Sequence, residues 1–127
     1  PSEAIRICME EGVPMEQITM SSDGNGSMSV PLPDGGAKLL VTRLSSLHEE
    51  VRDAVKAGVP VEKAIRICGE NPARANGLFS KKGCIRPGSD ADLVILDEEF
   101  LVDTVFARGQ KMVEYGKALV KGTFETD

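Results

Sequence analysis

The sequence predicts an α/β fold in the first part of the chain and a small β region in the last part. Apolar residues recur at helical spacing up to about residue 80, interrupted by one short alternating run that predicts a strand. From residue 81 onward, short β-type runs are separated by glycine turns. We therefore expect two portions, residues 1–80 and 81–127.

The first portion opens with a helix. Ile5 and Met9 lie on one side of a helical pattern over residues 2–11, which Gly12 ends. Ile18 and Met20 alternate with polar residues and predict a short strand. Residues 28–37 combine two prolines with a Gly-Gly pair, so we expect an irregular loop long enough to overhang a site.

Three helices are predicted after this loop. The first is long and amphipathic and ends at Gly58, with an apolar face made of Leu40, Leu44, Leu47, Val51 and Val55. The second starts at Pro60 and runs to about residue 68, because the fixed φ of proline suits the first turn of a helix. The third is short, enters through Pro72 and closes at Gly77.

The second portion changes to a two-residue period. Strands are expected at residues 84–85, 93–96, 102–107, 111–113 and 118–120. Turns with Pro87-Gly88, Gly109 and Gly116 separate them. Asp90 and Asp92 fall in a turn before an apolar strand. We interpret them as acids that close this turn, in preference to metal ligands.

Composition excludes several classes of function. The 127 residues carry a formal net charge of −5 and their basic residues are scattered, which argues against a nucleic-acid partner. No apolar run approaches the roughly 20 residues that cross a bilayer, so we expect no membrane partner and a cytoplasmic location. The three cysteines form no C-x-x-C pair, which argues against a zinc-thiolate site.

The segment 21–27, Ser-Ser-Asp-Gly-Asn-Gly-Ser, is the candidate for chemistry. It places Asp23 among small residues directly after the predicted strand, where α/β barrels carry catalytic groups. This carboxylate could bind a divalent metal, accept a proton from metal-bound water, or cap the following turn. Ser27 offers a hydroxyl beside glycine amides that can approach an anionic ligand closely.

Two rival interpretations of this segment are weaker. Asp23, Asn25 and Ser27 match the start of a calcium loop, but Met28 stands where the sharp turn needs glycine and Asp34 where a glutamate should close the site. A nucleophilic serine lacks a partner, because the one histidine, His48, lies on a predicted helical face.

Several motifs together resemble a known family. Residues 71–74 (Asn-Pro-Ala-Arg), 82–85 and 87–95 resemble the C-terminal signature of metal-dependent amidohydrolases. The segment 21–27 and the stretches 105–109 and 116–126 are similar to those of isoaspartyl dipeptidases, also called β-aspartyl peptidases. This resemblance covers essentially the whole chain.

The resemblance implies a fold and an activity. The fold would be the C-terminal portion of a TIM-like (β/α)8 barrel, residues 1–80, plus the C-terminal part of a small β-sandwich, residues 81–127. The activity would be zinc-dependent hydrolysis of the isopeptide bond of β-aspartyl dipeptides at a two-zinc centre. Asp23 would ligate a metal and act as the catalytic proton carrier, and Ser27 would bind a carboxylate of the dipeptide.

Other ligands of the family have no match in this sequence. They are an early His-x-His pair, a carboxylated lysine and two later histidines, whereas this chain has a single histidine. We therefore expect the chain to be the C-terminal third of such an enzyme, inactive by itself, and we expect the enzyme to be a homo-oligomer. The alternatives are another amidohydrolase, of dihydroorotase or N-acyl amino acid deacylase type, and a non-catalytic scaffold fragment.

Overall fold

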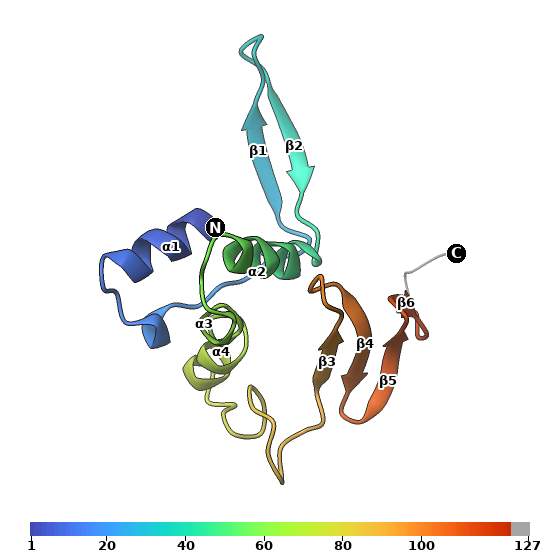
Figure 1. Cartoon of the computed structure of the whole chain (residues 1–127). Helices are drawn as coiled ribbons and strands as arrows, with labels where there is room; N and C mark the ends of the chain where they lie inside the picture. The colour runs from blue at the N-terminus through green and yellow to red at the C-terminus, as the bar shows by residue number, and fades with distance from the viewer. Residues whose placement is uncertain (123–127) are drawn as a thin grey trace. The chain divides into compact units, whose positions relative to one another are not determined.

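The computed structural model describes residues 1–122 (Figure 1). The chain divides into two compact units, the first formed by Pro1–Pro72 and the second beginning at Ala73. This division lies before the boundary predicted at residue 80, and the predicted bounds of the two portions, residues 1–80 and 81–127, stay a prediction. Residues 123–127 of the predicted second portion, and with them the last part of the 116–126 motif, lie outside the described residues.

Helices dominate the described part of the first unit. They are α1 (Ser2–Glu10), the 3-10 turn η1 (Met15–Gln17), α2 (Ser46–Lys56) and α3 (Val61–Arg66), while α4 (Glu70–Ala75) spans the division between the units. The helix predicted over residues 2–11 is confirmed. Gly12 and Gly58 end α1 and α2 with φ of +74° and +94°, values that glycine adopts without a steric penalty.

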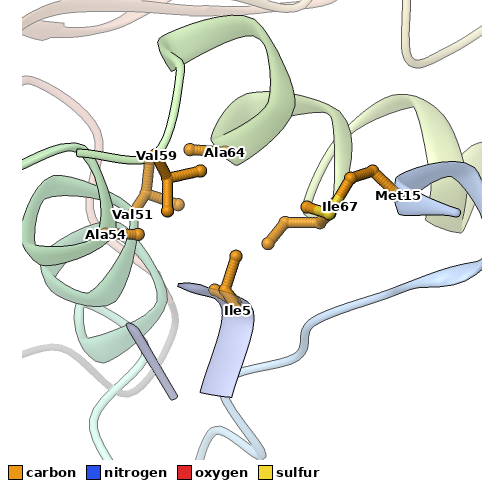
Figure 2. Packing of buried hydrophobic residues seen from close by; sticks show 7 residues of the cluster. All are labelled: Ile5, Met15, Val51, Ala54, Val59, Ala64 and Ile67. Carbon is orange, nitrogen blue, oxygen red and sulfur yellow. The ribbon is translucent and has the colours of Figure 1, made fainter. Parts of the chain in front are cut away.

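One apolar cluster holds α1, η1, α2 and α3 together (Figure 2). Its buried members are Ile5, Met15, Val51, Ala54, Val59, Ala64 and Ile67. The side chains of Val59 and Ile67 are fully buried, and burial of each contributes roughly 1.5–3 kcal/mol to folding. Ile18 and Met20 pack against the cluster, so the core also anchors the segment that leads to Asp23.

A β-hairpin replaces the predicted irregular loop. β1 (Ser27–Pro31) pairs antiparallel with β2 (Ala37–Val41), so the interpretation of residues 28–37 as irregular was wrong. The placement of Leu40 and Leu44 on the first long helix was also wrong, because α2 begins at Ser46. A short apolar run such as residues 39–41 suits a strand or a helix equally well. Pro31 is tolerated because it is the last residue of β1, and no other strand within residues 1–122 pairs with this hairpin.

The predicted strand at Ile18–Met20 does not join a described sheet. Ile18 has an extended backbone, with φ −97° and ψ 131°, and the Met20 amide donates to the carbonyl of Ile67 at 2.9 Å. A strand of a parallel barrel pairs with neighbouring strands, and residues 1–122 supply none beside this segment. The segment is therefore extended but unpaired.

The second unit contains an antiparallel sheet. Its strands are β3 (Leu93–Leu96), β4 (Val102–Ala107), β5 (Gln110–Glu114) and β6 (Lys117–Ala118), in the order β3-β4-β5-β6. The strands predicted at 93–96 and 102–107 are confirmed, whereas residues 84–85 form no strand. No helix in the described part of the chain has the length and apolar character needed to cross a membrane.

Candidate functional site

Asp23 lies in a tight turn between the extended segment and β1. Its backbone has φ +47°, and Asn25 in the same turn has φ +64°. This left-handed region is uncommon for residues other than glycine, although Asp and Asn tolerate it better than most. Non-glycine residues held in this region cluster at functional sites, which makes the turn a candidate site.

The backbone amides of the turn find partners other than the Asp23 carboxylate. The amide of Asp23 donates to Ser21 Oγ at 3.3 Å, and the amide of Gly24 donates to Ser22 Oγ at 3.2 Å. The amide of Asn25 donates to the carbonyl of Thr42 at 3.0 Å, and that of Gly26 to the carbonyl of Asp23 at 2.8 Å. A capping role for the carboxylate was one of the open alternatives, and these bonds leave it no amide to cap within the turn.

The Asp23 carboxylate itself is exposed and makes no hydrogen bond or ion pair with any residue between 1 and 122. Ser27, the other residue singled out by the sequence, is the first residue of β1 and is also exposed. Its hydroxyl has no hydrogen-bond partner in the described part of the chain. The fold therefore places an unengaged carboxylate and an unengaged hydroxyl at the two ends of one turn.

A buried asparagine holds the segment that precedes this turn. Asn71 is 3% exposed, and its Nδ2 donates to the carbonyls of Met15 and Ile18, at 2.7 Å in each case. Its Oδ1 is buried without a hydrogen-bond partner among the described residues. The sequence reasoning used residues 71–74 as a motif but missed this role, because the contact joins positions 53 and 56 residues apart.

The described residues do not form a metal site by themselves. Between residues 1 and 122, no group of three or more His, Cys, Asp or Glu side chains comes together in a way that could hold a metal ion. Catalytic zinc typically takes three protein ligands per ion, and Asp23 offers one carboxylate. Two zinc ions therefore do not fit this chain unless other polypeptide supplies the remaining donors.

The other polar residues considered in the sequence, His48, Asp90 and Asp92, do not belong to the turn at Asp23. His48 is half-buried on α2. In the second unit, Lys82 Nζ lies 2.9 Å from an Asp90 carboxylate oxygen and also pairs with Asp92, which accepts a bond from the Arg108 amide at 2.7 Å. These bonds confirm the interpretation of both acids as residues that close the turn before β3.

Comparison with solved structures covers almost the whole chain. A β-aspartyl dipeptidase of Fervidobacterium islandicum AW-1, solved in complex with the β-Asp-Leu dipeptide, is 31% identical with a TM-score of 0.80 over 98% of this chain. An amidohydrolase of Thermotoga maritima is 26% identical with a TM-score of 0.60 over 89% of this chain. The chain spans 33% of the dipeptidase chain and 26% of the amidohydrolase chain.

Comparison with curated proteins finds relatives whose names give other activities. An adenine deaminase of Clostridium perfringens is 36% identical over 81 residues, which are 62% of this chain and 14% of the deaminase. A D-hydantoinase of Streptomyces coelicolor is 42% identical over 55 residues, which are 43% of this chain and 11% of the hydantoinase. The chain thus spans a small part of the curated relatives that it matches.

A family model covers most of the molecule. The model described as the amidohydrolase family matches residues 2–118. The fold class expected from the sequence, part of a TIM-like (β/α)8 barrel with part of a small β-sandwich, is confirmed by the mixed helix and strand content and by these structural neighbours. Members of the family commonly use a metal and act as hydrolases. This chain belongs to the amidohydrolase family.

Proposed function

We propose that this chain is the C-terminal third of a hydrolase that cleaves the isopeptide bond of β-aspartyl dipeptides. One observation carries the proposal: the 31% identity and TM-score of 0.80 to a β-aspartyl dipeptidase extend over 98% of this chain. The identity therefore includes both units and is not confined to one common motif. The substrate would be a small dipeptide, and the complete enzyme would be a homo-oligomer that uses zinc.

The chemistry assigned to this chain is proton transfer by Asp23. In hydrolysis, a water oxygen adds to the side-chain carbonyl carbon of the β-aspartyl group, the C–N bond breaks, and the amine leaves with a proton. Asp23 would take the proton from the attacking water and deliver it to the leaving nitrogen. The absence of any hydrogen bond or ion pair to this carboxylate within residues 1–122 supports the assignment, because the group is available as a base.

Ser27 would bind the substrate. Its exposed hydroxyl can donate a hydrogen bond to a carboxylate of the dipeptide, and a charged acceptor makes such a bond stronger than a neutral one. The turn between Asp23 and Ser27 keeps the proton carrier and the binding group close in the chain. The metal ligands that Asp23 would join must come from other parts of the enzyme, since the described residues do not supply them.

The second candidate is deamination of adenine. It is favoured by the 36% identity to an adenine deaminase, which extends over 62% of this chain. Hydrolytic deamination also needs a carboxylate that delivers a proton to a leaving amine, so Asp23 would keep its role. Ser27 distinguishes the two candidates, because adenine has no carboxylate for its hydroxyl to bind.

The test uses the complete enzyme and three compounds. β-Asp-Leu, α-Asp-Leu and adenine are incubated separately, and released leucine and ammonia are measured. We expect leucine from β-Asp-Leu and neither product from the other two compounds. Ammonia from adenine without leucine from β-Asp-Leu would replace the first candidate by the second, and no product from any compound would refute both.

A further inference from the structure

Thr42 is bonded to the turn that carries Asp23 through its side chain and its backbone. It follows β2, so the hairpin brings it back to the turn from 19 residues away. Its hydroxyl donates to the carbonyl of Asp23 and lies 3.1 Å from the carbonyl of Gly26. Its amide donates to Gly26 O at 3.0 Å, and its carbonyl accepts from the Asn25 amide at 3.0 Å.

The hydroxyl is the part of these contacts that depends on the residue type. Any residue other than proline at position 42 could make the two main-chain bonds. The Thr42 hydroxyl can also donate to the Asp23 carbonyl, which an aliphatic side chain of the same size cannot do. The identity of residue 42 therefore acts on Asp23 through one hydroxyl group.

The Asp23 backbone needs such support. With φ at +47° it occupies a region that the surrounding structure must maintain. A bond to the Asp23 carbonyl fixes the peptide plane that follows the residue. Because φ and this plane together set the direction of the Cα–Cβ bond, the Thr42 hydroxyl helps to direct the carboxylate.

We propose that Thr42 is a positioning residue for Asp23, a role that rests on the proposed function. Its hydroxyl holds the turn in the arrangement from which the carboxylate exchanges a proton with the substrate. Thr42 itself does not touch the substrate. Because Thr42 follows directly after β2, the base of the β1–β2 hairpin stabilises the turn that carries Asp23.

The test compares two variants of the complete enzyme. Thr42→Val replaces the hydroxyl by a methyl group of similar size, and Thr42→Ser keeps the hydroxyl. With β-Asp-Leu as substrate, we expect Thr42→Val to lower kcat by about tenfold or more with KM within about twofold, and Thr42→Ser to keep most of kcat. Thr42→Ala, which is smaller than valine, serves as the second hydroxyl-free variant where valine prevents folding.

A second measurement does not need activity. Hydrogen–deuterium exchange of a peptide spanning residues 20–30 reports two amides of the turn. The amide of Asn25 donates to the Thr42 carbonyl, and the amide of Gly26 donates to the Asp23 carbonyl, which the Thr42 hydroxyl also contacts. We expect faster exchange in Thr42→Val and wild-type exchange in Thr42→Ser. A wild-type enzyme without dipeptidase activity would refute the proposed function. The same exchange pattern would then still support the conclusion that the Thr42 hydroxyl stabilises the turn.

Three outcomes would overturn the inference. They are wild-type kcat in Thr42→Val, wild-type exchange in Thr42→Val, and equal losses of kcat in the valine and serine variants.

Discussion

The carboxylate of Asp23 folds against the backbone of Gly26. A methyl group added at Gly26 would lie 2.6 Å from Asp23 Oδ2 and 2.7 Å from the Asp23 carbonyl oxygen. Both distances are well below a van der Waals contact, so any side chain at position 26 would have to move Asp23. The glycine at this position keeps space for the proposed proton carrier.

Replacement of Gly26 by alanine should therefore act on catalysis. We expect Gly26→Ala in the complete enzyme to lower kcat/KM for β-Asp-Leu by about tenfold or more, because the new methyl displaces the carboxylate. The matched control is Gly36→Ala at the hairpin turn, where the added methyl would lie 3.1 Å from Asp34 Oδ1 and 3.8 Å from Leu32 Cδ1, both atoms at the ends of side chains. Equal activity of both variants would contradict the prediction.

Removal of the charge at Asp23 should have the largest effect on turnover. We expect Asp23→Asn in the complete enzyme to lower kcat by at least about a hundredfold, the scale of losing general acid–base catalysis. Asp53→Asn makes the same chemical change on the exposed side of α2 and should leave kcat unchanged. Steady-state assays with β-Asp-Leu measure kcat for both variants. Near-normal turnover in Asp23→Asn would refute the role of Asp23 as proton carrier.

The isolated 127-residue chain should be inactive. Its described residues bring no set of three metal-ligating side chains together, and a lone carboxylate cannot hold two zinc ions. We expect β-Asp-Leu incubated with the purified chain and zinc to be hydrolysed no faster than with zinc alone. Faster hydrolysis would show that the chain carries a working site of its own.

Asn71 should contribute strongly to stability. Asn71→Ala removes the bonds to the carbonyls of Met15 and Ile18 and leaves both acceptors without this donor. We expect a loss of roughly 2–4 kcal/mol in the free energy of unfolding, measured by urea denaturation. The exposed Gln17→Ala in η1 is the control and should change it by less than about 0.5 kcal/mol. A small loss in Asn71→Ala would mean that these bonds are weak.

The second unit should lose stability in acid through Asp92. Its bonds to Lys82 and to the Arg108 amide hold the pKa of this carboxyl below its ordinary value of 3.8. A group with a lowered pKa in the folded state adds stability above the unfolded pKa, and this stability is lost as the pH falls through the folded value. Thermal midpoints should therefore fall below about pH 4 in the wild type.

The comparison of Asp92→Asn with the wild type isolates this contribution. The variant should have a lower thermal midpoint near pH 7, and the difference from the wild type should shrink as the pH falls below 3.8. The exposed Glu16→Gln should follow the wild-type curve. A difference between Asp92→Asn and wild type that is constant with pH would exclude the ion pair as its cause.

Local sequence patterns determined several elements without help from the fold. The helix over residues 2–11 and the strands at 93–96 and 102–107 follow from apolar spacing and from glycine turns, which act over a few neighbouring residues. The candidate turn at Asp23 and Ser27 was also visible in the sequence, because a carboxylate among glycines is a local pattern. Whether these two residues have the proposed roles stays a prediction.

Contacts across long sequence distances were decided only by the tertiary structure. The apolar run at residues 39–41 suits a helix or a strand, and pairing with β1 made it a strand. The bonds of Thr42 to Asp23 and of Asn71 to Ile18 join positions 19 and 53 residues apart. No spacing rule reaches that far, because such contacts depend on how the chain returns to itself after its local elements have formed.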